Sequence, residues 1–144
     1  MPPTTTTDLA SILGVTKSHR TDLGIIESIM DGLSVKALYR IANFVSPHDA
    51  KFRFQIVPKA TLERRRKQHG QRLTVEEGAK VARLAKVWSS AMEVWRTEEN
   101  ARAFLFRPHV LLSSRKPIDV ALGTDLGARL VEEILGRLKY GSAP

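Results

Sequence analysis

The 144-residue sequence contains no cysteine, so disulfides, thiolate metal sites and cysteine nucleophiles are all excluded. It has no apolar run that approaches the roughly 18 residues of a membrane span, and its polar start, with threonine at residues 4–7, is not a signal peptide. Hydrophobic residues make up 42% and charged residues 26%, as in ordinary globular proteins. These features predict a cytoplasmic protein of one domain, or of two small ones that share a core, with no membrane attachment.

Acidic residues are scarce in one segment. Between Lys51 and Arg72 there are eight lysines or arginines and one acid, Glu63, which gives a local charge of +7 (8 − 1) in a chain whose formal charge is +8. The excess positive charge is therefore concentrated in this segment. Such a patch is typical of a surface that binds nucleic-acid phosphates. The alternatives are a solvated basic helix and a helix that binds RNA or an acidic protein surface.

Residues of the kind that build catalytic sites are present but scattered. None of the four histidines has the i, i+4 spacing of a helical metal pair, and no glycine-rich phosphate loop precedes a helix. The paired glutamates at 76–77 and 132–133 fall on different helix faces, so capping and solvation explain them better than acid–base chemistry. The sequence therefore predicts a protein that is not an enzyme, with no metal, no cofactor and no small-molecule substrate of its own.

Helical periodicity and capping signals cover nearly the whole chain. In the N-terminal half they predict one helix that contains 26–33, a second that starts after Ser34, a third from Pro47 to about Gln55 and a fourth from Lys59 to about His69. In the C-terminal half they predict a long helix that starts after Thr74, and further helices over 98–106, over 117–122 and from Thr124 to Tyr140. Thr74 and Glu77 have the spacing of a capping box. Trp88 and Trp95 are expected in the core, and only residues 110–112 have an extended character. The predicted fold class is all-α, in two subdomains that meet near residue 72.

A short helix followed by a basic helix is the arrangement of a helix-turn-helix, whose second helix enters the major groove. The candidate DNA-binding residues are Lys59, Thr61, Arg64, Arg65, Arg66 and Lys67. The first four would lie near the bases and the last two near phosphates, with Leu62 turned inward. The turn at 55–58 lacks the glycine that is common in such motifs. A homodimer is expected, and the apolar residues Ile25, Ile26 and Ile29 are either its contact face or part of the core.

Several short motifs occur in a fixed order. They are Thr61-Leu62-x-Arg64-Arg65, Leu73-Thr74-x-Glu76, Arg83-Leu84-Ala85, Ala101-x-x-Phe104-Leu105, Pro108, Pro117-Ile118-Asp119, Thr124-x-x-Gly127 and Tyr140-Gly141. In this order and spacing, from about Leu23 to Gly141, the chain resembles the antitoxins of RES–Xre toxin–antitoxin pairs, the Xre/MbcA/ParS family. It departs from the family pattern at 94–97 and 113–116, where glycines are usual, and at Phe104, where tryptophan is usual.

The polar start predicts a flexible N-terminal tail (1–20). The resemblance implies an Xre-like helix-turn-helix domain for DNA binding and dimerisation (21–72) and a helical toxin-binding domain (73–144). It also implies a hetero-oligomer with a RES-domain toxin that degrades NAD or uses it for ADP-ribosylation. The C-terminal helix and tail would block the toxin's active site, and the N-terminal part would bind operator DNA and autoregulate the operon. The candidate toxin-binding residues are Arg129, Glu132, Glu133, Arg137, Lys139, Tyr140 and Gly141.

The alternative is a stand-alone helix-turn-helix transcription regulator that uses its C-terminal domain for dimerisation. A neighbouring gene for a toxin distinguishes the two hypotheses, because only the antitoxin requires one.

Overall fold

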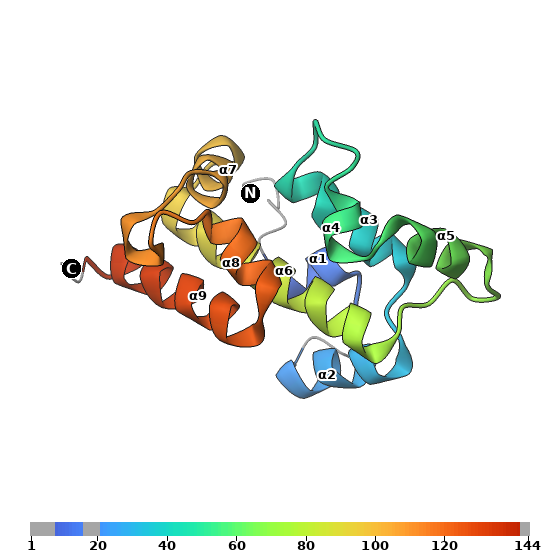
Figure 1. Ribbon diagram of the computed structural model, residues 1–144. Helices are drawn as coiled ribbons and strands as arrows, with labels where there is room; N and C mark the ends of the chain where they lie inside the picture. Colours follow the sequence, from blue (N-terminus) through green and yellow to red (C-terminus); the bar gives the residue numbers. More distant parts are fainter. Residues whose placement is uncertain (1–7, 16–20, 142–144) are drawn as a thin grey trace.

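The computed structural model describes residues 8–15 and 21–141, and within these ranges the chain is all-α, as predicted. The helices are α1 (Leu9–Leu13), α2 (Asp22–Asp31), α3 (Val35–Val45), α4 (Arg53–Ile56), α5 (Lys59–Lys67), α6 (Val75–Trp95), α7 (Glu98–Phe106), the 3₁₀ helix η2 (Val110–Leu112), α8 (Pro117–Gly123) and α9 (Asp125–Lys139). Figure 1 shows their arrangement. The β-structure of the described residues is limited to two isolated antiparallel bridges, Ser34 to Arg72 and His109 to Arg115. None of the described helices has the length and apolar character needed to cross a membrane.

Most helices start where a hydroxyl side chain can cap them. Thr74 Oγ1 accepts a hydrogen bond from the Glu77 backbone N–H at 3.2 Å, and Glu77 Oε1 accepts one from the Thr74 backbone N–H at 2.9 Å. The predicted capping box at the start of α6 is therefore confirmed. Thr97 and Thr124 cap α7 and α9 in the same way, at 3.1 and 2.9 Å. These caps satisfy backbone donors that a helix end otherwise leaves unpaired.

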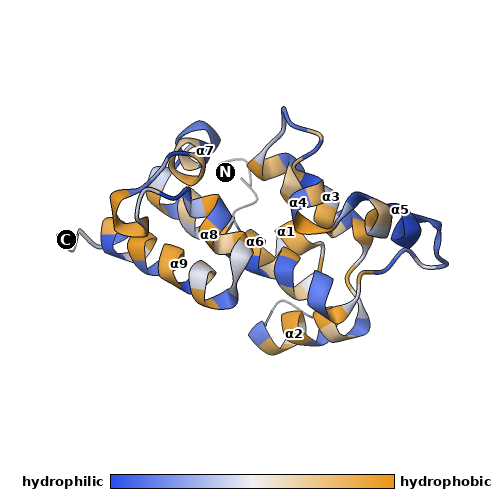
Figure 2. Ribbon diagram, in the orientation of Figure 1, coloured by the Kyte–Doolittle hydropathy of each residue, from blue (hydrophilic) through white to orange (hydrophobic). Residues whose placement is uncertain are grey.

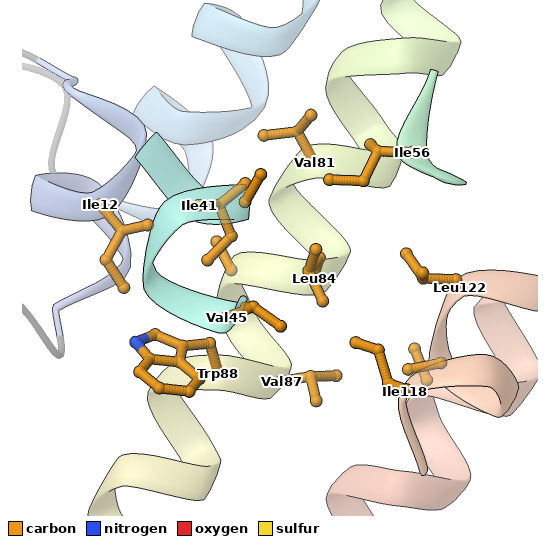
Figure 3. Packing of buried hydrophobic residues seen from close by; sticks show 14 of the residues in the cluster. Ile12, Ile41, Val45, Ile56, Val81, Leu84, Val87, Trp88, Ile118 and Leu122 are labelled. Atoms are coloured by element: carbon orange, nitrogen blue, oxygen red, sulfur yellow. The ribbon is translucent and has the colours of Figure 1, made fainter. Parts of the chain in front are cut away.

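Helix α6 is the axis of the molecule. It packs against α1–α4 on one side and against α7, α8 and α9 on the other (Figure 1). Its buried residues join both sides into one hydrophobic cluster: Ile12 and Val45 approach Trp88 from one side, and Ile118 approaches Val87 from the other (Figure 3). The two halves predicted to meet near residue 72 thus share one continuous core.

The expected flexible tail over 1–20 is wrong for residues 9–13. These form α1, which Asp8 caps through a 3.2 Å hydrogen bond from the Ser11 backbone N–H. Ile12 is fully buried and α1 packs against α3 and α6. Residues 1–7 and 16–20 lie outside the described residues. The helix was missed because five residues provide too little periodicity to reveal a buried face.

Two other predicted boundaries are wrong. The helix expected from Pro47 to Gln55 is limited to α4, because Asp49 Oδ1 accepts a hydrogen bond from the Lys51 backbone N–H at 2.9 Å and favours a turn there. The basic helix ends at Lys67 rather than His69. The segment 110–112, expected to be extended, forms the 3₁₀ helix η2, in which the His109 ring nitrogen Nδ1 caps the Leu111 backbone N–H at 3.1 Å.

Candidate functional site

The basic helix α5 follows α4 after a two-residue turn. Val57 is extended and buried, and Pro58 restarts the helix, because the residue before a proline avoids the α-helical region. Leu62 is 1% exposed and holds the helix on the core, as predicted. The last turn contains residues 64–67, where positive charge is favourable beside the negative end of the helix dipole. Figure 2 shows α5 as a strongly hydrophilic helix at one end of the molecule.

Arg65 differs from its basic neighbours on α5. Its side chain is only 15% exposed, and its Nε donates a hydrogen bond to Glu77 Oε1 at 2.9 Å. The prediction placed Arg65 near DNA bases beside Arg64, but this geometry turns its guanidinium towards the start of α6. Thr61, one turn earlier on the same side, is half-buried. The basic side chains that α5 leaves exposed for a partner are Lys59, Arg64, Arg66 and Lys67, and the acidic Glu63 is exposed on the same helix.

Two of these exposed cations lie against aromatic rings of the preceding helices. The Arg66 guanidinium carbon lies 5.9 Å from the ring centroid of Tyr39 in α3, and Lys59 Nζ lies 5.9 Å from that of Phe54 in α4. Arg53 of α4 lies over the same Tyr39 ring at 4.7 Å. Tyr39 was not among the predicted site residues, because it lies outside the basic segment.

At the other end of the molecule, α8 and α9 form a tight helical hairpin against α6. Arg83 of α6 donates hydrogen bonds at 3.1 Å from Nε to the Ala121 carbonyl and from Nη2 to the Leu122 carbonyl, and it pairs with Asp125 at the start of α9. These carbonyls lie at the end of α8, where the helix leaves them without partners. Arg83 therefore fixes where α9 begins and which of its faces is exposed.

The seven candidate toxin-binding residues of α9 and its end fall into two groups. Glu132 and Lys139 turn towards α6: Ser90 Oγ donates to Glu132 Oε1 at 3.2 Å, and Lys139 Nζ donates to Glu93 Oε2 at 2.6 Å. The hydrogen bond from Lys139 to Glu93, with the negative charge of Glu93, raises the pKa of Lys139 above its ordinary value. The other five candidates are exposed: Arg129, Glu133, Arg137, Tyr140 and Gly141.

The exposed group forms a ridge. Arg129, Glu133 and Arg137 are four residues apart, so they lie one above another on the outer face of α9. Tyr140, 77% exposed, follows at the end of the helix. Among the apolar residues of α9, Val131, Ile134 and Leu135 are buried, whereas Leu130 and Leu138 are 39% and 47% exposed. The outer face of α9 is therefore a mixed charged and apolar surface, which suits binding to a protein.

A pocket of about 330 Å³ lies beside the end of α9. It is lined by residues of α6, α7, the following loop and α9: Trp95, Asn100, Ala103, Phe104, Arg107, Pro108, His109 and Leu138. Trp95, expected in the core, is only partly buried and forms one wall of this pocket, whereas Trp88 is 1% exposed. No group of metal-ligating side chains occurs among residues 8–15 and 21–141.

The comparisons with known proteins agree with this arrangement. A family model described as the antitoxin Xre/MbcA/ParS C-terminal toxin-binding domain matches residues 90–141, which include α9, the pocket and Tyr140. The protein "Antitoxin Xre" of Yersinia enterocolitica serotype O:8 / biotype 1B (strain NCTC 13174 / 8081) is 32% identical over 142 residues, 97% of this chain and 93% of that protein. An all-α protein with a toxin-binding domain at its C-terminal end is the class that these observations define. The chain belongs to the Xre family of antitoxins.

Family membership gives the protein a toxin as partner and indicates a regulatory rather than a catalytic role. It favours the antitoxin over the stand-alone regulator, because the match to a toxin-binding domain covers the C-terminal part that the alternative reserves for dimerisation.

Proposed function

We propose that this antitoxin blocks the active site of a RES-domain toxin that consumes NAD, either by degrading it or by ADP-ribosylation, with the end of α9 as the blocking element. The observation that carries the proposal is the exposure of this end. Tyr140 is 77% exposed just beyond α9, and the match to the toxin-binding domain extends through it to residue 141. Helix α9 ends at one extremity of the molecule (Figure 1). A projecting helix end with a bare aromatic ring is suited to enter a concave site.

The contact with the toxin would have two parts. The ridge of Arg129, Glu133 and Arg137 would contact the rim of the toxin's cleft, while Tyr140 and Gly141 would enter it. Lys139 is tied to Glu93 and would orient Tyr140, since its Nζ lies 5.4 Å from the centroid of the Tyr140 ring. Aromatic residues near the centre of an interface carry a large part of binding energy, and rim charges a smaller one.

Co-expression with the adjacent gene tests this proposal. The toxin alone should stop growth and lower cellular NAD, and the full-length antitoxin should co-purify with it and restore both. A chain that ends at Lys139, or the variant Tyr140→Ala, should still bind but protect poorly. The matched control is Leu126→Ala, an equally exposed apolar residue at the start of α9. Full protection by the shortened chain would remove the blocking role of the tail.

We propose in addition that α5 binds operator DNA, which makes the N-terminal half a helix-turn-helix domain. Support comes from the exposed cations Lys59, Arg64, Arg66 and Lys67 on one helix that is anchored to the core through Leu62. Arg65 is left out of this set, because its guanidinium is bound to Glu77. Binding of the purified protein to a labelled duplex from upstream of its own gene, compared with a scrambled duplex, tests this function.

A homodimer would suit a DNA-binding protein of this kind. Helix α2 leaves Leu23, Ile26 and Met30 exposed at 64%, 54% and 63%, whereas Ile25 is buried. These exposed residues recur every three or four positions and lie on one helix face. We propose this face as the contact between two copies. Ile26→Glu should then reduce the mass measured by light scattering from that of a dimer to that of the 16.1 kDa chain.

A further inference from the structure

Two arginines from different helices lie against the same tyrosine ring. The guanidinium carbons of Arg53 in α4 and Arg66 in α5 lie 4.7 and 5.9 Å from the centroid of Tyr39 in α3. Helices α3 and α4 pack together and α5 follows α4 directly (Figure 1), so both arginines reach the same ring of α3. Attraction between a guanidinium and an aromatic face limits where each side chain moves.

Neither arginine forms an ion pair within the described residues. Arg65, Arg83 and Arg102 each form an ion pair with a carboxylate, but in the part of the chain that the structure describes no carboxylate pairs with Arg53 or Arg66. The Nε atom of Arg53 is buried and has no hydrogen-bond partner. Both guanidinium groups lie within 6 Å of one ring centroid, so their positive charges repel each other, and an anion that contacts both would relieve this repulsion.

We propose that Tyr39, Arg53 and Arg66 form a clamp for one phosphate group of the DNA backbone, beside the groove that α5 enters. The proposal rests on the DNA binding proposed for α5. Arginine donors match the geometry of phosphate oxygens, often with two hydrogen bonds from one side chain. The tyrosine ring orders both side chains before the phosphate arrives, and this reduces the entropy lost on binding.

The position of the clamp identifies its ligand as backbone phosphate. Arg66 shares α5 with the exposed Arg64 and Lys67, so a duplex that contacts these residues brings a strand of phosphates past Tyr39. Lys59 lies over the Phe54 ring. It is seven residues, about two turns, before Arg66 on α5, so it adds another cation on the same side of the helix as Arg66. Phosphate contacts fix the register of a protein on DNA without reading its sequence. The clamp therefore contributes to affinity and orientation and leaves base preference to Arg64 and its neighbours.

Salt dependence of DNA binding tests the clamp in the full-length protein. The affinity for a labelled duplex from upstream of the gene would be measured at several salt concentrations for the wild type and for Arg53→Gln, Arg66→Gln and Tyr39→Leu. Each arginine variant should lose about tenfold in affinity and reduce the slope of log K against log salt by about one. The preference for this duplex over a scrambled one should stay unchanged.

The controls separate the clamp from general charge and from folding. Arg115→Gln removes one exposed positive charge from the loop before α8 and should change neither affinity nor slope. Tyr39→Leu should weaken binding although both arginines remain, whereas Tyr39→Phe, which keeps the ring, should bind like the wild type. Circular dichroism would establish that each variant is folded, and Arg66 is exposed enough that its replacement should not affect the fold.

The possible outcomes are distinct. Unchanged slopes in both arginine variants, with normal binding by the wild type, overturn the clamp and leave DNA binding by α5 intact. A wild type that binds no duplex overturns the proposed DNA binding and the clamp with it. A loss of preference for the upstream duplex in Arg53→Gln would assign this arginine to base recognition instead and would also overturn the proposal.

Discussion

Arg65 and Glu77 connect the basic helix to the central helix through one oxygen atom. Glu77 Oε1 accepts hydrogen bonds from Arg65 Nε and from the Thr74 backbone N–H, both at 2.9 Å. The same carboxylate therefore completes the capping box of α6 and holds α5 in place. Because α6 continues to α7, α8 and α9, this contact links the basic surface to the element that positions the toxin-binding end.

The contact between Arg65 and Glu77 should contribute to the free energy of unfolding in a pH-dependent way. Burial alone would raise the pKa of Glu77, but hydrogen bonds from Arg65 and Thr74 and the charge of Arg65 outweigh it, so the pKa lies below its ordinary value of 4.5. A lowered pKa in the folded state means that the contribution is present above about pH 4.5 and is lost as the pH falls through the folded-state pKa. Glu77→Gln should therefore lower the free energy of unfolding by about 1–2 kcal/mol at neutral pH.

Urea denaturation at neutral and acidic pH measures this effect. The difference in the free energy of unfolding between the wild type and Glu77→Gln should become smaller below about pH 4. Glu76→Gln is the matched control: Glu76 is exposed in the same helix turn and interacts mainly with the helix dipole, so its loss should cost about 0.5 kcal/mol. A difference for Glu77→Gln that persists unchanged in acid would show that the carboxylate charge is not what stabilises this contact.

Neighbouring arginines on α5 should have separable effects. Arg65→Gln should lower the free energy of unfolding by about 1–2 kcal/mol, because it removes a charged hydrogen-bond donor from the half-buried Glu77. Arg64→Gln should leave stability within about 0.5 kcal/mol of the wild type and weaken DNA binding by about 1–3 kcal/mol if it reads a base. Thermal unfolding and DNA titration on both variants check the pair. Equal effects of the two substitutions on stability would contradict the structural role of Arg65.

The short helix α1 should be essential for stability. Ile12 is fully buried against α3 and α6, so Ile12→Ala should lower the free energy of unfolding by about 2–5 kcal/mol. Leu126→Ala, which trims a side chain that is 72% exposed, should change it by less than about 0.5 kcal/mol. Because the core is continuous, circular dichroism and tryptophan fluorescence should report one unfolding transition. Separate transitions for the two signals would show that the halves are independent.

Long helices with capping signals could be predicted from the sequence. Ser34, Thr74, Thr97 and Thr124 mark helix starts, because a hydroxyl before a periodic apolar segment has a specific local role. Helices α1 and α4 could not be predicted with their bounds, since at four or five residues they depend on tertiary contacts rather than on periodicity. The sequence left open one domain or two small ones that share a core, and the packing of α6 on both sides decides for a shared core.

The candidate surfaces were only partly predictable for a similar reason. Sequence shows which segment is basic, but Arg64 and Arg65 are indistinguishable until Glu77 is placed beside one of them. Likewise, Glu132 and Glu133 are neighbours in sequence, yet Glu132 lies against Ser90 and Glu133 is exposed. Local charge is thus readable from the sequence, whereas its pairing depends on the fold.

Two glycines of α9 should respond oppositely to the same substitution. A Cβ at Gly127 would collide with the Val120 carbonyl oxygen of α8, so Gly127→Ala should destabilise the hairpin by at least about 1–3 kcal/mol. A Cβ at Gly136 would meet nothing within 4 Å, and Gly136→Ala should stabilise the helix by about 0.5–1 kcal/mol. Denaturant unfolding of both variants compares them directly. A tolerated Gly127→Ala would mean that α8 and α9 can separate without cost.

Three non-glycine residues in the toxin-binding half adopt the left-handed conformation that favours glycine. Arg96 ends α6 with φ +69°, and Ser113 and Ser114 have φ +54° and +63° in the turn before α8. They lie in the two segments, 94–97 and 113–116, where the sequence resemblance led us to expect glycine. The backbone thus keeps a conformation that costs an L-residue about 1–2 kcal/mol.

Restoring glycine at these positions should therefore stabilise the protein. Arg96→Gly should gain about 0.5–1 kcal/mol, because the relief of strain exceeds the added entropy of the unfolded chain. Arg96→Ala is the matched control, since it removes the same side chain but keeps the Cβ that causes the strain. Thermal midpoints should rise for Arg96→Gly and for Ser114→Gly and should stay level or fall for Arg96→Ala. An equal rise in Arg96→Ala would assign the gain to loss of the arginine side chain instead of to the backbone, and the strain argument would fail at this site.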